Sequence, residues 1–258
     1  MIDKNIIIFT DLDGTLLDHA NYGFEAALPM LNYIKTNDIP LIIVTSKTKN
    51  EVLRIQELLD LKSPFIVENG AGIFIPFEDS YEKIALGFEY EHIRACFLKY
   101  AKSVQMHGFF DMSDEEVAKH TNLSVENAAD AKRRTFTEPF ILKDENRLSE
   151  LKRMANEDGL DIVTGGRFHH LITQGQDKSN AIKHFIKDYA KNREEGLKTI
   201  ALGDSANDLT MLQSVDTPIL IPHPDSSYMN CDIRGLIKAP YPGPEGWNAT
   251  LKEYFNVK

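Results

Sequence analysis

Two aspartates, Asp11 and Asp13, stand where a run of apolar residues ends. Residues 6–9 read Ile-Ile-Ile-Phe, which is typical of a strand buried on both faces of a parallel sheet. Side chains two positions apart point to opposite sides of a continuing strand. Gly14 instead predicts a turn, which lets both carboxylates reach one site. On its own, such an Asp-x-Asp pair is more often a solvated strand end than a catalytic site. Further residues of the chain are needed to distinguish the two.

Other strand-like segments of the chain also end in polar residues. These are Thr45, Ser46 and Lys47 after the segment 40–44, Asp204 and Asp208 after the segment 199–202, and Lys178 at the start of the preceding helix. The carboxyl ends of parallel strands converge on one crevice. Several carboxylates in one crevice are unfavourable as ions unless a cation joins them. Oxygen ligands favour a hard divalent ion, so we expect Mg²⁺ as the cofactor.

A carboxylate-bound Mg²⁺ beside a lysine and a threonine suits phosphoryl transfer. The metal and the lysine neutralise phosphate oxygens while one carboxylate attacks in line and becomes an aspartyl-phosphate. A second carboxylate can protonate the leaving oxygen and later activate water. Hydrolysis of a phosphate monoester is so slow without a catalyst that the site must supply about 20 kcal/mol or more. A nucleophile, a metal, a lysine and an acid can do so together, whereas a single general base cannot.

The elements that must position these residues alternate between strands and helices. Strand-like and helical patterns follow one another at 6–10, 22–36, 40–45, 48–60 and 65–67. This alternation predicts parallel strands joined by right-handed crossovers. The same pattern resumes near Asp177, and a rigid Pro/Gly-rich loop at 240–247 is expected before a final helix. We therefore predict an α/β fold with a Rossmann-like parallel-sheet core.

Between these halves, from about residue 80, the pattern changes to helices and short paired strands. The expected elements are helices at 89–104, after the capping box 113–116 and at 146–158, and strands at 133–142, 160–164 and 168–173. We predict that residues 83–173 form an inserted α+β cap domain that sets substrate specificity. The catalytic core then comprises residues 1–82 and 174–258.

Length and composition exclude several classes of protein. The chain of 258 residues is 42% hydrophobic, its formal net charge is -10, and its apolar runs are too short for a membrane span. The acidic balance argues against a nucleic-acid partner, and an anionic substrate would need a local cation or a metal. Two distant cysteines, Cys96 and Cys231, and the lack of a visible signal peptide lead us to expect a cytoplasmic protein. The oligomeric state is left open.

Four motifs together resemble those of the haloacid dehalogenase superfamily. They are DLDGT at 11–15, Thr45-Ser46-Lys47, Lys178 and GDSAND at 203–208, in the usual order. The insertion between the second and third motifs is similar to the C2 class of cap. Four further stretches resemble the mannosyl-3-phosphoglycerate phosphatase family: VTSKT at 44–48, VENGAGIF at 67–74, GGRFHHL at 165–171 and GPEGW at 243–247.

The resemblance implies catalytic and metal-binding roles. It makes Asp11 the nucleophile and Asp13 the acid/base, with its backbone carbonyl on the metal. Thr45 would hold the transferring phosphoryl group, and Lys178 would stabilise the aspartyl-phosphate. Asp204 would be a metal ligand, and Asp208 would either ligate the metal or orient its water. The implied metal set is therefore Asp11, Asp13, Asp204 and Asp208. Ser179 departs from the glycine that often follows the lysine, but a serine suits the start of a helix.

The predicted substrate-binding residues are more widely spread. They are Ser46, Lys47, Glu68, Asn69, Gly70, Gly166, Arg167, His169 and Asn207. The Arg167 guanidinium can fork onto a carboxylate or phosphate. Alternation along a strand sends only one of His169 and His170 toward the site, and His169 shares the face of Arg167.

The resemblance implies a Mg²⁺-dependent phosphatase that acts on a small anionic phosphorylated sugar. The preferred substrate is mannosyl-3-phosphoglycerate or its glucosyl counterpart. Three alternatives remain open: a broad sugar-phosphate or sucrose-phosphate phosphatase, a phosphohexomutase, and a non-catalytic binding protein. The intact set of Asp11, Asp13, Lys178 and Asp204 counts against the last, because a binder gains nothing from a nucleophile beside a metal.

Overall fold

Strand β1 (Ile6–Thr10) lies inside the larger sheet, with all of its residues buried and a parallel neighbour on each side. The structure is a computed structural model that describes residues 5–165, 168–190 and 196–257. Within those residues the larger sheet has the strand order β12 (Ile237–Lys238), β11 (Thr217–Leu220), β10 (Lys198–Gly203), β1, β2 (Leu41–Val44), β3 (Phe65–Val67), β4 (Gly72–Phe77), β5 (Ser80–Ala85). The pairs from β11–β12 through β2–β3 are parallel.

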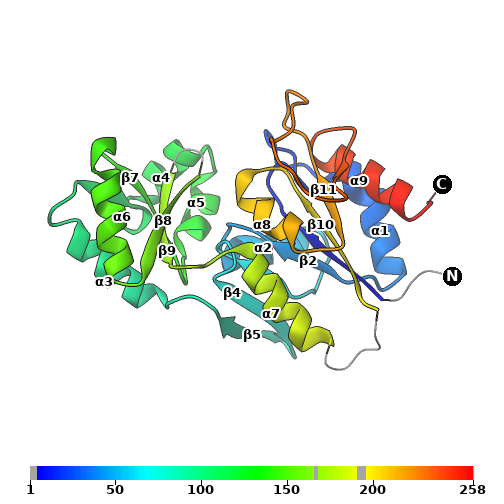
Figure 1. The fold of residues 1–258 in the computed structure, drawn as a ribbon, viewed down its shortest axis with the longest axis horizontal. Coiled ribbons are helices and arrows are strands. Elements are labelled where there is room, and N and C mark those ends of the chain that lie inside the picture. The colour runs from blue at the N-terminus through cyan, green and yellow to red at the C-terminus, as the bar shows by residue number, and fades with distance from the viewer. Residues whose placement is uncertain (1–4, 166–167, 191–195, 258) are drawn as a thin grey trace. The chain divides into compact units, whose positions relative to one another are not determined.

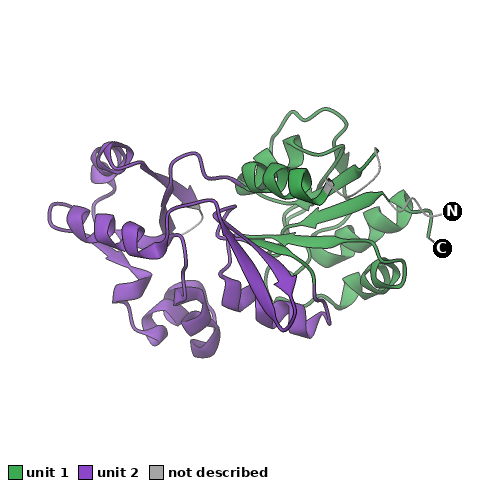
Figure 2. Ribbon diagram, turned by 90° about the horizontal axis from the view of Figure 1, so that it is seen from below, with its two compact units in different colours: residues 1–45, 63–66, 178–258 green, residues 46–62, 67–177 purple. Residues whose placement is uncertain are grey.

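Contacts divide the chain into two compact units (Figure 2). Unit 1 comprises Met1–Thr45, Ser63–Ile66 and Lys178–Lys258, and unit 2 comprises Ser46–Lys62 and Val67–Asp177. The division predicted from the sequence places only residues 83–173 in the cap, and it stays a prediction.

The helices of unit 1 cover its strands on both faces. They are η1 (Glu25–Ala27), α1 (Leu28–Thr36), α7 (Lys178–Ala190), η4 (Ala206–Asp208), α8 (Leu209–Gln213) and α9 (Gly243–Tyr254). Helix α1 packs against α9, and α7 packs against α8 (Figure 1). This two-sided cover explains why the strands are continuously apolar, and it confirms the predicted α/β fold. Among the described residues, no helix combines the length and the hydropathy that a membrane span requires.

Unit 2 contains a second, antiparallel sheet. Its strand order is β6 (Met106–Gly108), β7 (Glu138–Leu142), β9 (Phe168–Thr173), β8 (Leu160–Gly165). The other elements of unit 2 are α2 (Lys49–Leu58), β4, β5, α3 (Tyr90–Tyr100), η2 (Phe109–Asp111), α4 (Asp114–Thr121), α5 (Val125–Lys132), η3 (Glu145–Arg147) and α6 (Leu148–Glu157). The predicted capping box opens α4, with the Ser113 side chain accepting from the Glu116 amide.

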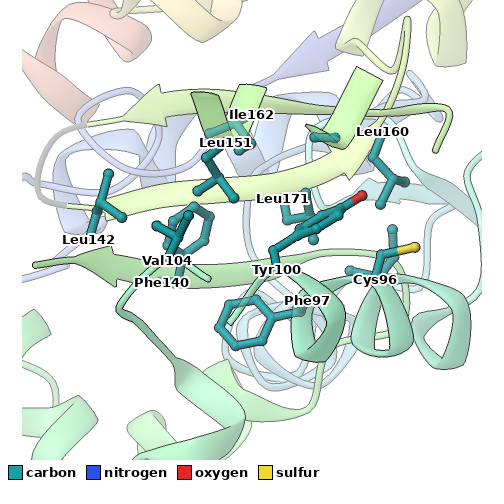
Figure 3. Close-up of a cluster of buried hydrophobic side chains, with 12 residues drawn as sticks. Cys96, Phe97, Tyr100, Val104, Phe140, Leu142, Leu151, Leu160, Ile162 and Leu171 are labelled. Carbon is teal, nitrogen blue, oxygen red and sulfur yellow. The ribbon is translucent and has the colours of Figure 1, made fainter. Parts of the chain in front are cut away.

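Helices α3 and α6 cover one face of this second sheet (Figure 3). Phe97 and Tyr100 of α3 and Leu151 of α6 are buried in one cluster with Phe140 of β7 and Leu171 of β9. Because strand side chains alternate, the residues of β7 and β9 that share this face are held away from solvent. The face therefore belongs to the core of unit 2.

The strand predicted over residues 133–142 is shorter in the structure, where β7 begins at Glu138. Helix α5 extends to Lys132, and the amides of Thr135 and Phe136 donate to the Glu68 carboxylate. A side chain distant in sequence thus takes the hydrogen bonds that a strand neighbour would otherwise accept.

The rigid loop predicted at 240–247 is also shorter, because α9 already begins at Gly243. Proline is tolerated in the first helical turn, where the amide that it lacks would have no helical partner. Pro244 occupies that turn. Trp247 is fully buried in the helix, and its Nε1 donates to Thr10 Oγ1 at 3.1 Å.

Candidate active site

The carboxyl ends of two neighbouring strands bring the first acidic residues together in unit 1. Strands β1 and β10 are parallel with Thr10 opposite Leu202. The Asp11 amide continues this pairing by donating to the Leu202 carbonyl at 2.9 Å. Asp204 directly follows the last residue of β10. The register of the sheet therefore sets Asp11 and Asp204 side by side.

Gly14 provides the predicted turn after Asp13. Its φ is +74°, a left-handed conformation that side chains rarely adopt, and its amide donates to the Leu17 carbonyl at 2.9 Å. A Cβ at Gly14 would lie 2.7 Å from Oδ2 of Asp204. The glycine is thus required both by the turn and by the close approach of the second carboxylate.

Lys178, the first residue of α7, is the central cation of the site. It is 1% exposed, and its Nζ donates at 2.7 Å to Oδ1 of Asp11 and at 2.7 Å to Oδ1 of Asp208. Burial alone would lower the pKa of Lys178, but the two carboxylates more than offset burial and raise it. The lysine is therefore a fixed positive charge at any physiological pH.

Asp208 is held by contacts on both of its oxygens. Oδ1 accepts from Lys178, while Oδ2 accepts from the amides of Asp204 and Ser205, both at 3.1 Å. These two amides lie at the start of η4. Asp208 therefore fixes the turn that carries Asp204 as well as the lysine.

The three aspartates form an acidic cluster with one carboxylate oxygen from each of Asp11, Asp204 and Asp208, all within 4.8 Å of one another. Burial raises the pKa of Asp11 well above its usual range, although the Lys178 ammonium acts in the opposite direction. Burial and then repulsion from Asp208 raise the pKa of Asp204 to about 7, against the hydrogen bond from Thr15 Oγ1. One lysine does not neutralise three carboxylates.

This imbalance fits a bound divalent cation. Clustered carboxylate oxygens are hard ligands, and a cation among them would remove the repulsion that raises the pKa of Asp204. Among the described residues, Asp11, Asp204 and Asp208 form the group of side chains that could hold a metal ion. The side chain of Asp13 lies outside the group, as expected if its backbone carbonyl is its ligand atom.

The remaining predicted residues of unit 1 lie at neighbouring strand ends. Thr45 follows β2 and is buried, with its amide donating to the Ile66 carbonyl at 3.0 Å. Asp13 is half-buried. Asn207 is exposed within η4, where its side chain accepts from Ser205 Oγ. Thr15 was not predicted as a site residue, although its place in the DLDGT motif offered a signal.

The predicted substrate-binding residues of unit 2 occupy two turns. Ser46 accepts through its carbonyl from Arg134, and Lys47 accepts through its carbonyl from the Glu68 amide at 3.0 Å. The Glu68 side chain is buried, and Asn69 is half-buried. Gly70 completes the second turn, with its amide on the Val67 carbonyl at 3.1 Å. Arg134 was not predicted, because its contact with the Ser46 carbonyl joins residues 88 positions apart in the sequence.

The histidines of β9 alternate as predicted. His169 is buried on the helix-covered face against Phe140, with Nδ1 2.9 Å from Thr164 Oγ1 and Nε2 3.1 Å from the Glu145 carboxylate. His170 is half-buried, and burial followed by the nearby Arg134 lowers its pKa to about 3. The substrate-binding role of His169 stays a prediction. Gly166 and Arg167, the other predicted residues of this region, lie outside the described residues.

Comparison with known proteins gives a consistent picture. Residues 8–222 match the model of a family described as haloacid dehalogenase-like hydrolase. The chain is 46% identical to a glucosyl-3-phosphoglycerate/mannosyl-3-phosphoglycerate phosphatase of Persephonella marina, with 97% of each chain covered. It is 39% identical to a protein of the same name from Methanococcoides burtonii, with 96% of each covered.

Solved structures show the same fold at low sequence identity. A protein of Thermoplasma acidophilum has a TM-score of 0.70 at 17% identity, covering 98% of both chains. The sucrose-phosphatase of Synechocystis, solved with sucrose and phosphate, has a TM-score of 0.64 at 14% identity, covering 98% of this chain and 99% of that one. At these identities the likeness concerns the fold alone.

Proposed function

The chain belongs to the haloacid dehalogenase-like hydrolases, and from this premise we propose that it is a Mg²⁺-dependent phosphatase acting on a glycosyl-3-phosphoglycerate. The superfamily resemblance of its four motifs is thereby confirmed. The observation that carries the proposal is the buried Lys178 ammonium, 2.7 Å from both Asp11 and Asp208, beside Asp204. A nucleophile, a cation and metal ligands are what phosphoryl transfer requires.

The substrate is proposed from the named relatives. Two proteins, 46% and 39% identical over nearly the full length, are called glucosyl-3-phosphoglycerate/mannosyl-3-phosphoglycerate phosphatases. We therefore propose mannosyl-3-phosphoglycerate or glucosyl-3-phosphoglycerate as substrate, with the mannosyl compound preferred. The products are the glycosylglycerate and inorganic phosphate.

The metal is proposed to be Mg²⁺, held by Asp11, Asp204, Asp208 and the backbone carbonyl of Asp13. When bound, it neutralises phosphoryl oxygens that the acidic cluster would otherwise repel. The excess of carboxylate over ammonium at this site supports a divalent rather than a monovalent ion.

In the first chemical step, a carboxylate oxygen of Asp11 attacks the phosphorus atom and forms an aspartyl-phosphate. The bond between phosphorus and the glycerate oxygen breaks, and Asp13 gives its proton to that oxygen. Lys178 orients the nucleophile through Oδ1 and faces the charge of the transferred group. Thr45, at the neighbouring strand end, is proposed to hold a phosphoryl oxygen.

In the second step, water attacks the phosphorus atom while Asp13, now ionised, takes a proton from that water. The bond between phosphorus and Asp11 breaks and releases phosphate. Asp13 is thereby returned to its protonated form, and Asp11 to its carboxylate, so the site is ready for another cycle.

The substrate-binding assignments remain part of this proposal. Ser46 and Lys47 would contact the phosphate end, Asn69 and Gly70 the sugar, and Gly166, Arg167, His169 and Asn207 the rest of the substrate. We also propose residues 83–173 as the specificity domain. A cytoplasmic location is proposed from the free thiols Cys96 and Cys231.

The test is phosphate release from a panel of esters, with Mg²⁺ and with a chelator. The panel contains mannosyl- and glucosyl-3-phosphoglycerate, sucrose phosphate and hexose phosphates. We expect the first two to have the highest kcat/KM and the chelator to abolish release. Equal rates on all esters would indicate a broad sugar-phosphate phosphatase, and an isomeric sugar phosphate without phosphate release would indicate a mutase.

A further inference from the structure

Glu68 of unit 2 carries a carboxylate that is fully used inside the protein. The side chain is 0% exposed. Oε1 accepts from the Thr135 amide at 2.8 Å, and Oε2 accepts from the Phe136 amide at 3.2 Å and from Thr137 Oγ1 at 2.6 Å. Because the carboxylate is 0% exposed and already accepts three hydrogen bonds from its own chain, sugar hydroxyls cannot reach it in this structure.

The backbone around Glu68 is held in an uncommon conformation. Glu68, Asn69 and Gly70 have φ values of 51°, 57° and 92°, and a left-handed glutamate is much rarer than a left-handed asparagine or glycine. The Glu68 amide donates to the Lys47 carbonyl at 3.0 Å, and Gln176 Nε2 donates to the Glu68 carbonyl at 2.6 Å. Every polar group of this residue is therefore engaged.

Arg134 connects the same region to the turn after β2. Its Nε donates to the Ala131 carbonyl at 2.9 Å, and its Nη1 donates to the Ser46 carbonyl at 2.9 Å. Burial raises the pKa of Glu68, and the Arg134 guanidinium is the nearby charge that most opposes the effect. Arg134 is thus placed to serve both the Ser46 turn and the Glu68 turn.

Three further contacts lie in the same region of unit 2. Thr48 Oγ1 donates to the Asp130 carbonyl at 3.0 Å, and the Asp130 carboxylate pairs with Arg54 at 2.6 Å. A Cβ on Gly72 would lie 2.3 Å from the Phe136 ring, so a side chain at position 72 would clash with that ring. The segments 46–48 and 68–72 are thereby fastened to residues 130–137.

We propose that Glu68 and Arg134 are positioning residues that fix the turn beginning at Ser46, and thereby Thr45, the residue directly before it. The inference rests on the proposed function only for the phosphoryl-holding role of Thr45. Two anchors converge on the turn: Arg134 on the Ser46 carbonyl and the Glu68 amide on the Lys47 carbonyl. Glu68 is thereby reassigned from reading the substrate to holding the catalytic strand end.

The first test needs no turnover. Hydrogen exchange at the amides of residues 45–48 and 68 is compared, by mass spectrometry, in wild type, Arg134→Gln and the neighbouring control Arg133→Gln. Arg133 is exposed, and its pair with the Asp130 carboxylate is long at 3.6 Å, whereas Arg54 contacts the same carboxylate at 2.6 Å. We expect exchange to be about tenfold faster in Arg134→Gln, as for the loss of a partly buried hydrogen bond, and unchanged in the control. Equal exchange in all three proteins would overturn the proposal.

The second test separates positioning from recognition. Turnover of mannosyl-3-phosphoglycerate and of para-nitrophenyl phosphate, which lacks sugar hydroxyls, is measured for Glu68→Gln and Arg134→Gln. A displaced Thr45 predicts that kcat falls about ten- to hundredfold on both esters, with part of the loss recovered in Arg134→Lys. A rise in KM confined to the sugar ester would mean that Glu68 reads the substrate, and would overturn the proposal.

Two controls keep these results interpretable. If Glu68→Gln does not fold, Thr137→Val removes a single donor to the carboxylate and is expected to give the same exchange and kcat changes in smaller degree. Thr137→Val exchange and kcat equal to those of wild type would count against the proposal. If wild type releases no phosphate from either ester, the proposed function fails, whereas the exchange experiment still decides whether the two anchors hold the turn.

Discussion

The two units bury carboxylates in opposite ways. In unit 1, Asp11, Asp204 and Asp208 gather within 4.8 Å around a single ammonium, so negative charge remains in excess. In unit 2, the Glu68 carboxylate accepts three hydrogen bonds from neutral donors. Burial opposes the ionisation of the carboxylates in both units. Only the cluster in unit 1 leaves negative charge that a bound cation could neutralise.

This difference separates a site that is suited to binding a ligand from a site that stabilises the protein's own backbone. An incompletely neutralised cluster is unstable by itself and gains from a cation or from the reacting group. A saturated carboxylate gains nothing from a ligand but loses much when any donor or acceptor is removed. The same kind of substitution should therefore have opposite effects in the two units.

The largest expected effect is that of Asp11→Asn on turnover. Removing the nucleophile should lower kcat by about 10⁴-fold or more, since residues that form the covalent intermediate are not replaced by their neighbours. Thermal unfolding should show a Tm equal to or above that of wild type, because one repelling charge is lost. A variant with near-normal kcat would contradict the covalent mechanism.

Lys178→Met should have the largest effect on stability. It leaves the acidic cluster without its buried partner, and the loss of one member of a buried ion pair costs about 3–5 kcal/mol. Urea unfolding in a chelator measures this loss, and added Mg²⁺ should recover part of it. Unchanged stability would mean that the carboxylates are protonated rather than neutralised by the lysine.

Two matched acid-to-amide substitutions test whether the buried carboxylates of the two units affect stability in opposite directions. Asp204→Asn relieves repulsion and should raise the Tm of the metal-free protein while abolishing the rise in Tm on adding Mg²⁺. Glu68→Gln replaces one of the two acceptor oxygens by an NH2 group, which then faces one or two of the three existing donors, and it should cost about 1–3 kcal/mol. Stability changes of the same sign in both variants would show that the two units do not differ in this way.

The smallest expected effect is a pH dependence of metal stabilisation. The pKa of Asp204 is raised to about 7 in the folded protein, above its unfolded value, so this group makes the metal-free protein less stable as pH rises toward 7. Metal binding requires the ionised form, and at about pH 6 only about a tenth of Asp204 is ionised. The rise in Tm caused by Mg²⁺ should therefore be larger at pH 8 than at pH 6. A rise that is independent of pH would show that Asp204 does not titrate on metal binding.

Much of unit 1 could be predicted from local sequence alone. The apolar run before Asp11 is β1, and Gly14 adopts the left-handed turn that its position indicated. Parallel strands end at the same edge of a sheet, so the predicted parallel sheet was enough to place Asp11 and Asp204 at one edge, and the observed pairing of β1 with β10 makes them neighbours. These features depend on periodicity and on the special conformations of single residue types.

The features that sequence reasoning missed depend on distant partners. Residues 133–137 have strand-like composition, but the Glu68 carboxylate takes the amide bonds of Thr135 and Phe136. Likewise, nothing adjacent to Arg134 signals that it reaches the Ser46 carbonyl. Such contacts join residues about 70 to 90 positions apart, beyond any local pattern.

The central claim is that Asp11 itself carries the phosphoryl group. Wild-type protein is mixed with mannosyl-3-phosphoglycerate and Mg²⁺, quenched in acid within the first turnover, and analysed by peptide mass spectrometry. We expect one phosphoryl group on the peptide that contains Asp11 in wild type, and none in Asp11→Asn. Rapid phosphate release without any phosphorylated peptide, together with an active Asp11→Asn protein, would contradict it.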